Sequence, residues 1–236
     1  MSNNYFQFKQ FKIEQAHCAM KVSTDACMQG AWTPIEPSVK RVLDIGTGTG
    51  LLSLMLAQRN EYIYIDAVEL DRNAALQATD NIANAPWNSR VHVHHTDVKT
   101  FMPEELYDMV ICNPPFFQNS LQGVHANRNM ARHNDSLSYE DLFAAIDKVL
   151  TKDGYASIML PATEFDIWEQ LLNNKGWSVP AKLLVKPRVT QAHNRIIGLC
   201  RRNPVSAIAA EELCIYADQG YTNEFTKLMQ PYYLDL

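Results

Sequence analysis

The chain has 236 residues, of which 47% are hydrophobic and 20% are charged, a composition that excludes an intrinsically disordered protein. No run approaches the roughly 18–20 consecutive apolar residues of a membrane-spanning helix, so we expect no membrane partner. The formal net charge of −5 does not indicate a protein that binds nucleic acid with its whole surface.

The predicted elements begin in residues 1–38, where Phe6, Phe8, Phe11 and Ile13 alternate loosely and residues 24–32 have the pattern of a short helix. Beyond them, apolar runs typical of strands alternate with segments that have helical spacing. The predicted strands span residues 41–45, 63–68, 91–94, 109–112, 155–160, 181–185 and 196–200, and the predicted helices span residues 51–59, 72–85, 142–150 and 164–174.

Strands that alternate with helices predict an α/β fold with a mostly parallel sheet, because parallel neighbours need crossover connections. Ligands of such sheets bind beyond the carboxyl ends of the strands. We therefore expect one compact domain over residues 39–236, with residues 1–38 as a cap that packs over this edge of the sheet.

Cysteine usage and the first residues bear on compartment and metal binding. The 5 cysteines include no CxxC pair, which argues against both a disulfide framework and a structural zinc site. The chain starts without the basic and apolar run of a secretory signal. These features predict a cytoplasmic protein that holds no metal.

A glycine-rich loop follows the first predicted strand of the domain, in the segment Asp44-Ile45-Gly46-Thr47-Gly48-Thr49-Gly50. Glycines at alternate positions allow a tight turn and the close approach of a ligand. Glu69, about twenty residues on, is placed to accept hydrogen bonds from ribose hydroxyls. The pattern indicates a nucleoside-type ligand, and the alternative is a packing turn beside an incidental surface glutamate.

The fourth predicted strand runs into Asn113-Pro114-Pro115-Phe116. Two prolines stop the strand and stiffen the turn, because each fixes φ and lacks a backbone donor. The Asn113 side chain and the Pro114 carbonyl could accept hydrogen bonds from an exocyclic amino group, while Phe116 stacks on a flat base. The alternative is a rigid strand-ending turn with a buried phenylalanine.

Basic residues gather in two stretches that contain no acidic residue, residues 182–202 and 111–134. Such clusters on an otherwise acidic protein favour a local phosphate-binding track, although ordinary solvated charge is the alternative. The residues that we expect to contact RNA are Arg128, Arg132, Lys186, Arg188, Arg195 and Arg201.

The glycine loop resembles motif I of the class I S-adenosylmethionine-dependent methyltransferases. This resemblance implies that Glu69 binds the ribose of the cofactor, that Asp97 binds its adenine amino group beside Val98, and that Asp44 lies near its methionine end. Asp97 taken alone fits the cap of a helix or turn better than a ligand contact. The cofactor-binding set implied in the domain is Asp44, Gly46, Gly48, Gly50, Glu69, Asp97, Val98 and Asn113.

The segment Asn113-Pro114-Pro115-Phe116 resembles the Asn/Asp-Pro-Pro-aromatic signature of amino-group methyltransferases, which implies catalytic roles for these four residues. That class acts on adenine, on guanine in RNA and on a glutamine amide in release factors. The motif therefore leaves the owner of the target nitrogen open.

Residues 8–13 and 20–25, together with Ala131-Arg132-His133, resemble the bacterial tRNA1(Val) adenine-37 N6-methyltransferase family. This resemblance implies that Lys21 and Thr24 contact the cofactor, although Thr24-Asp25 also fits the start of a helix. It further implies a monomeric, Rossmann-like methyltransferase with a seven-stranded, mostly parallel sheet and helices on both faces.

The function that follows is methyl transfer from S-adenosyl-L-methionine to N6 of adenine in tRNA. The alternatives are an rRNA guanine-N2 methyltransferase, a protein-glutamine N5 methyltransferase, and a non-catalytic RNA-binding or assembly protein with a relic cofactor pocket.

Overall fold

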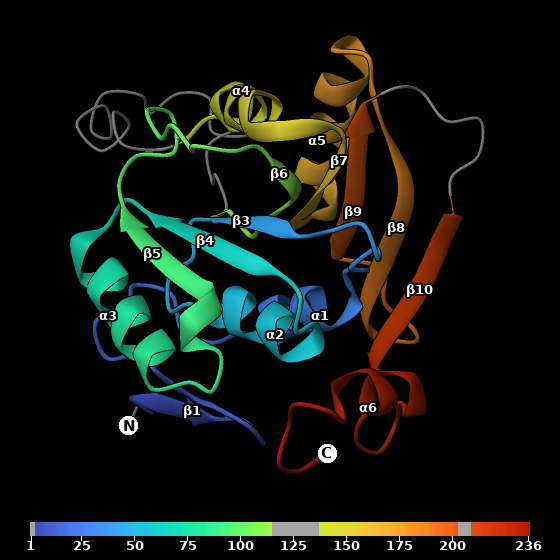
Figure 1. Ribbon diagram of the computed structural model, residues 1–236. Helices are drawn as coiled ribbons and strands as arrows, with labels where there is room; N and C mark the ends of the chain where they lie inside the picture. The colour runs from blue at the N-terminus through green and yellow to red at the C-terminus, as the bar shows by residue number, and fades with distance from the viewer. Residues whose placement is uncertain (1–2, 115–136, 203–208) are drawn as a thin grey trace, which may run out of the picture.

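The computed structural model describes residues 3–114, 137–202 and 209–236 (Figure 1). Its strands are β1 (Tyr5–Gln7), β2 (Lys12–Glu14), β3 (Arg41–Ile45), β4 (Tyr64–Glu69), β5 (Val91–His95), β6 (Tyr107–Cys112), β7 (Leu150–Pro161), β8 (Trp177–Arg188), β9 (Arg195–Arg202) and β10 (Ala209–Tyr216). Its helices are α1 (Thr24–Trp32), α2 (Leu51–Arg59), α3 (Arg72–Ala83), the 3-10 turn η1 (Asn88–Arg90), α4 (Tyr139–Val149), α5 (Ala162–Asn174) and α6 (Asn223–Met229).

The main sheet has the strand order β10-β8-β9-β7-β6-β3-β4-β5. Strand β9 runs antiparallel to both β7 and β8, and the other pairs are parallel. The predicted fold class, an α/β fold with a mostly parallel sheet, is therefore confirmed.

The predicted number of strands was too low by one, because the described sheet has 8 strands. The additional strand is β10, which pairs in parallel with β8 along its length. Its first residues are exposed, and only Leu213 and Ile215 are buried. A strand on the sheet edge with so few core positions shows little of the alternation from which strands are predicted.

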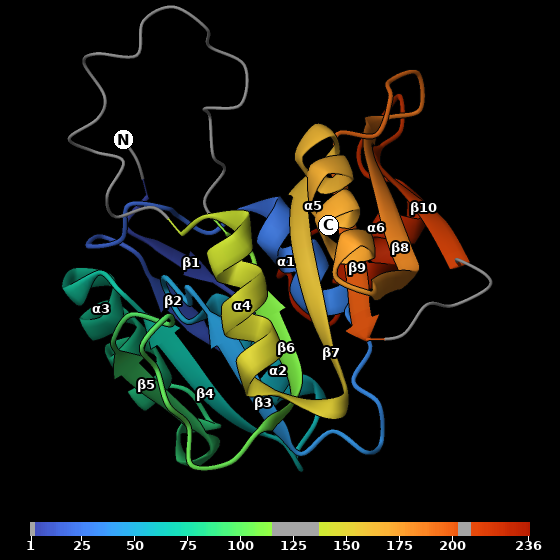
Figure 2. The ribbon, with the colours of Figure 1, turned by 90° about the horizontal axis from the view of Figure 1, so that it is seen from above.

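Helices cover both faces of the sheet, as Figures 1 and 2 show. Alternate residues of β6 serve the two layers: Met109 and Ile111 belong to the core beneath α1 and α2, whereas Val110 belongs to the core beneath α4 and α5. This division follows from the pleat, since successive side chains of a strand point to opposite faces. The two cores hold the central strands rigidly between helices.

The first residues of the chain pack against the rest of the molecule. Phe8 and Ile13 are buried in the same core as α2, and Phe8 pairs with Tyr233 in an isolated bridge. The two termini therefore lie on the same side of the molecule (Figure 1). The division of the chain at residue 38 stays a prediction.

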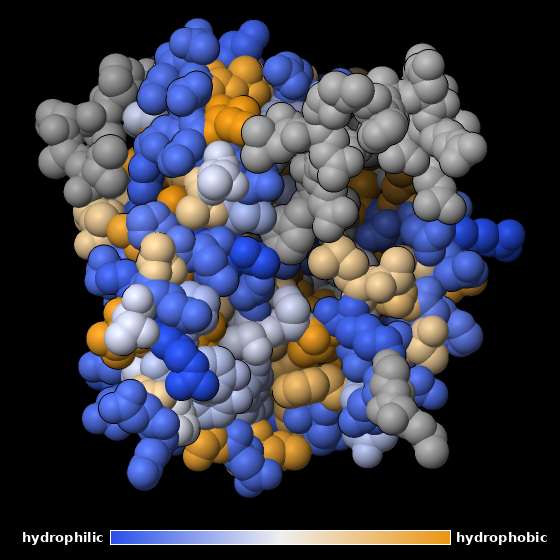
Figure 3. Space-filling view, turned by 180° about the vertical axis from the view of Figure 1, so that it is seen from behind, coloured by the Kyte–Doolittle hydropathy of each residue, from blue (hydrophilic) through white to orange (hydrophobic). Residues whose placement is uncertain are grey.

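The outer surface shown in Figure 3 is mostly hydrophilic, with hydrophobic residues in separate groups. None of the described helices is both long and apolar enough to cross a membrane.

Candidate functional site

The glycine loop connects β3 to α2 and brings three left-handed glycines into one short turn. Gly46, Gly48 and Gly50 have φ values of 69°, 57° and 83°, which other residues rarely adopt. A Cβ built on Gly46 or Gly48 would meet nothing within 4 Å, whereas one on Gly50 would lie 3.4 Å from the Ile82 side chain. The backbone at Gly46 and Gly48 therefore borders open space, and Gly50 packs against α3.

Glu69 lies at the end of β4 and holds the loop in place. Its Oε2 accepts a hydrogen bond from the Gly48 N–H at 2.8 Å, and its Oε1 accepts one from the Asp71 N–H at 2.9 Å. Each oxygen still has acceptor capacity for a ligand hydroxyl. The carboxylate is thus oriented before any ligand arrives.

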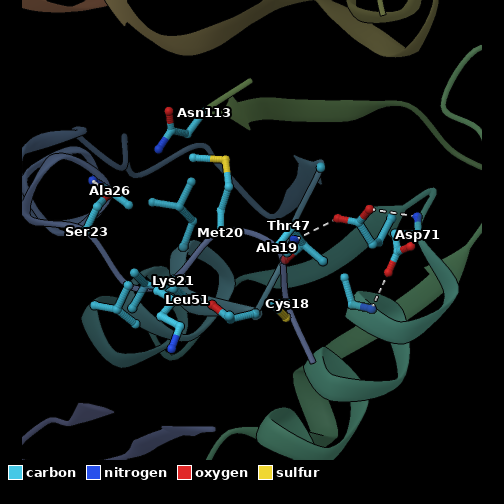
Figure 4. Close-up of a pocket in the computed structure, with 17 residues that line it drawn as sticks. Cys18, Ala19, Met20, Lys21, Ser23, Ala26, Thr47, Leu51, Asp71 and Asn113 are labelled. Atoms are coloured by element: carbon cyan, nitrogen blue, oxygen red, sulfur yellow. Dashed lines mark hydrogen bonds between the residues drawn. The ribbon is translucent and has the colours of Figure 1, made fainter. Parts of the chain in front are cut away.

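A cavity of about 270 Å³ opens between the glycine loop, residues 18–23 and the end of β6. Lys21, Glu69 and Asn113 line it, and Figure 4 shows the Met20 side chain extending toward Asn113. The Oδ1 atom of Asn113 is buried and has no hydrogen-bond partner among the described residues. A buried acceptor without a partner is costly, which marks this atom as a site for a ligand donor.

A second cavity, of about 560 Å³, lies on the other side of Glu69. Asp97 and Val98 line it, and it shares Gly46, Glu69 and Asp71 with the first cavity. The carboxyl ends of β3, β4, β5 and β6 thus place the predicted residues of four separate segments around one extended depression.

Asp97 also caps the backbone that follows it. Its Oδ1 accepts from the Lys99 N–H at 2.9 Å, and its Oδ2 lies 3.5 Å from the Lys99 Nζ. The capping role and the proposed ligand contact are compatible, since the residue still lines the second cavity.

Asp44 is buried beneath the glycine loop. Its Oδ2 accepts hydrogen bonds from the Thr47 and Ser53 hydroxyls, both at 2.7 Å, while its Oδ1 has no partner among the described residues. Burial raises the pKa of the Asp44 carboxyl to about 6, although these hydrogen bonds oppose the shift. A cation bound nearby would favour the charged form.

The structure separates the two amino-terminal residues that the resemblance had implied as cofactor contacts. Lys21 lines the first cavity, but Thr24 is not among the described residues that line either one, and its side chain is hydrogen-bonded with Tyr233. The residue that caps α1 is Ser23, whose Oγ accepts from the Ala26 N–H at 3.2 Å. Thr24 and Asp25 therefore start helix α1, and the residue before them caps it.

The predicted RNA-binding cations on β8 and β9 are paired with groups from distant parts of the chain. Lys186 lies 2.9 Å from Glu212, Arg195 lies 2.9 Å from Asp25, and Arg201 forms an ion pair with Glu36. Arg188 donates to the Ala217 carbonyl at 3.4 Å and lies over the Tyr216 ring. The fold therefore brings acidic residues from other parts of the chain next to these cations, although residues 182–202 contain none.

These cations also lie at opposite ends of the strands. Arg195 is opposite Pro161 and Val185, at the edge where β7 ends, whereas Arg201 is opposite Tyr155 and Ser178. Six residues of extended strand separate them by about 20 Å. Arg195 thus lies at the same end of the strands as Asn113, and Arg201 lies at the opposite end.

Several predicted residues lie outside the described part of the chain, namely Pro115, Phe116, Arg128 and Arg132. Pro114 is described and buried. Sequence reasoning missed the contribution of Cys18, Ala19 and Asp71 to the first cavity and of Leu137 to the second. The only signal in the sequence was proximity, since residues 18 and 19 are close to Lys21 and Asp71 is close to Glu69.

Among the described residues, no group of three or more histidine, cysteine or carboxylate side chains is placed to hold a metal ion.

We compared the chain with known protein families and their members. The family described as Methyltransferase small domain matches residues 32–158. The tRNA1(Val) (adenine(37)-N6)-methyltransferase of Dyadobacter fermentans is 40% identical over 236 residues, covering 98% of each chain. The proteins of the same name from Tolumonas auensis and Vibrio parahaemolyticus are 40% and 38% identical, covering 99% and 98% of this chain and 98% and 96% of their own.

Solved structures show the same fold at low sequence identity. A predicted O-methyltransferase from Agrobacterium tumefaciens has a TM-score of 0.69 at 17% identity, covering 88% of this chain and 96% of its own. The glycopeptide N-methyltransferase MtfA, solved in complex with S-adenosyl-L-methionine, has a TM-score of 0.57 at 13% identity, covering 78% and 96%. The chain thus has the Rossmann-like methyltransferase fold and belongs to the tRNA1(Val) (adenine(37)-N6)-methyltransferase family.

Proposed function

We propose that this protein transfers a methyl group from S-adenosyl-L-methionine to the N6 amino group of adenine 37 in tRNA1(Val). The observation that carries the proposal is the cavity in which the glycine loop, Glu69 and Asn113 meet, in a chain whose full-length relatives bear that name. A donor-binding loop and an acceptor-binding turn on one cavity are what methyl transfer to an amine requires.

The residues present fit this cofactor. The open space at Gly46 and Gly48 admits a ligand against the backbone, and the preoriented Glu69 carboxylate can accept from two ribose hydroxyls. The second cavity, with Asp97 and Val98, suits a flat base with an amino group. When bound, the cofactor supplies an electrophilic methyl group on a sulfonium centre.

The chain's own contribution to the transfer lies in the turn after β6. The N6 nitrogen of adenine is a poor nucleophile because its lone pair is delocalised into the ring. Hydrogen bonds from its two protons to the Asn113 Oδ1 and the Pro114 carbonyl would favour a pyramidal nitrogen and expose the lone pair. The Asn113 Oδ1 is buried and Pro114 fixes the backbone beside it, so little reorganisation is needed during the reaction.

The proposed RNA substrate suits an enzyme of this size. Adenine 37 lies beside the anticodon in a single-stranded loop, and extruding such a base costs less than flipping it from a duplex. Arg195, Lys186 and Arg188 lie toward the edge of the sheet that carries Asn113, where tRNA phosphates could pass. We propose a monomeric, cytoplasmic enzyme whose RNA-binding set also includes Arg128 and Arg132.

The test is incubation of the purified protein with methyl-labelled cofactor and separate pools of tRNA, rRNA and release factor. We expect label in tRNA alone, recovered as N6-methyladenosine at position 37 when the nucleosides are mapped by mass spectrometry. Label on rRNA guanine or on a protein glutamine would replace the proposal with one of those activities. Cofactor binding without transfer to any pool would instead indicate a non-catalytic RNA-binding protein.

A further inference from the structure

We propose that Gln29 is a positioning residue for methyl transfer, which holds the end of β6 so that Asn113 faces the acceptor amine. This inference rests on the proposed function, because it assigns a role within that reaction. The residue comes from α1, in the amino-terminal part of the chain, and not from the sheet that carries the motifs.

The Gln29 side chain is fully buried and bridges the last residue of β6 and the neighbouring part of β7. Its Nε2 donates to the Cys112 carbonyl at 3.1 Å and to the Ser157 carbonyl at 3.0 Å, and lies 3.4 Å from the Ser157 hydroxyl. Ser157 is in turn 2.7 Å from the Thr33 hydroxyl. The carboxamide thus joins β6 and β7 to α1.

The orientation of the amide follows from its partners. Two carbonyl oxygens can be met only by the NH₂ end, which has two hydrogens, so the amide cannot be reversed without opposing acceptors. The cost is that the Gln29 Oε1 is buried without a hydrogen-bond partner among the described residues. An apolar residue of the same length would remove the orphan Oε1 but would also take the Gln29 donor from both the Cys112 and the Ser157 carbonyl.

The geometry indicates that the bond from Gln29 to the Cys112 carbonyl orients Asn113, the residue that follows. The Cys112 carbonyl and the Asn113 nitrogen belong to one planar peptide unit, so a hydrogen bond to this carbonyl restrains the plane from which Asn113 starts. Pro114 stiffens the turn on the other side but offers no backbone donor of its own. Gln29 and Pro114 together hold Asn113 from both sides.

A second buried amide provides a matched contrast on the cofactor side of the cavity. Asn81 donates to the Thr49 carbonyl in the glycine loop at 2.9 Å and to the Glu14 carbonyl at 2.8 Å, and it accepts from the Glu14 N–H at 2.9 Å. Like Gln29, it ties the amino-terminal part to a loop of the site. Its loop borders the donor rather than the acceptor.

The experiment compares Gln29→Met, Asn81→Leu and Thr33→Val in the full-length protein. For Gln29→Met we expect kcat for tRNA methylation to fall by about tenfold or more, since an ångström of misplacement can cost roughly 100-fold, with the cofactor Kd unchanged within about threefold. For Asn81→Leu we expect the reverse, a weaker cofactor Kd with the larger part of kcat retained at saturating cofactor. Thr33→Val removes a bond of the same cluster but leaves the Cys112 carbonyl bonded, so kcat should be retained.

Two outcomes would overturn the proposal. One is a folded Gln29→Met protein with an unchanged kcat, and the other is an equal loss of kcat in Thr33→Val, which would attribute the effect to lost stability. Thermal unfolding of all variants shows whether they are folded. A wild-type protein that methylates no tRNA would instead refute the proposed function, and that result is read before any variant is compared.

Discussion

Asn113 is the residue on which the proposed chemistry depends most directly, because its buried Oδ1 has no hydrogen-bond partner among the described residues. We predict that Asn113→Ala lowers methyl transfer at saturating cofactor by on the order of 100-fold, as expected when one preorganised hydrogen-bonding group is removed from a transition state. The cofactor Kd should change little, since the glycine loop and Glu69 are untouched. Single-turnover transfer of labelled methyl and calorimetric titration of the cofactor measure the two effects.

Asn113→Asp serves as the control because its carboxylate keeps an acceptor oxygen at the position of the Asn113 Oδ1. It should retain more activity than Asn113→Ala, and equal rates in the wild type and Asn113→Ala would remove the residue from the mechanism.

Asp44 makes the stability of the protein depend on pH. Its pKa in the folded state is raised to about 6, so between about pH 4 and 6 the folded protein binds more protons than the unfolded chain. Stability therefore falls as the pH rises through this window, and the loss is complete above it. We predict that the free energy of unfolding of Asp44→Asn, compared with that of the wild type, rises by roughly 2–3 kcal/mol when the pH is raised from about 4 to about 7.5. Urea unfolding at the two pH values measures this change. Parallel pH profiles of the two proteins would contradict this assignment.

At the scale of elements, the packing of α5 on the reversed strand β9 leaves room for no side chain at Gly198. A Cβ there would lie 2.2 Å from the Cζ of Phe165 and 3.0 Å from the Cγ1 of Val179, and Phe165 is fully buried. We predict that Gly198→Ala lowers the free energy of unfolding by about 1–3 kcal/mol, the usual cost of overpacking a core. Adding Phe165→Leu should recover part of the loss, and a Gly198→Ala protein as stable as the wild type would show that the helix shifts freely.

Across the whole molecule, the direction of the strands decides which of the predicted RNA-binding cations lie near the proposed catalytic turn. Arg195 lies at the same end of the strands as Asn113, and Arg201 lies at the opposite end. If Arg195 contacts one phosphate, Arg195→Ala should weaken tRNA binding and reduce the slope of log K against log salt by about 0.9. Arg201→Ala should leave the slope unchanged. Equal changes in the two variants would show that the RNA crosses the sheet, as the clustering of these residues in the sequence had suggested.

The elements whose signals are local were predictable from the sequence. Helices α1 and α2 have the predicted bounds, because apolar spacing, the glycine loop and the residues that stop each helix act over a few positions. Gly46, Gly48, Glu69 and Asn113 were also proposed from local patterns, and the structure places all four on one cavity. The two cavities then formed at the predicted edge because parallel strands end together.

The tertiary structure alone decided which residues are neighbours across the chain. Arg195 meets Asp25 over 170 positions, and Gln29 meets Cys112 over 83. No local pattern encodes such pairs, because they arise only when separate elements pack on the same face of the sheet. For that reason the fold class could be predicted from local patterns alone, and so could the residues of the proposed catalytic turn after β6. The structure was needed to show which cations lie at the same end of the strands as that turn and which buried amide contacts it.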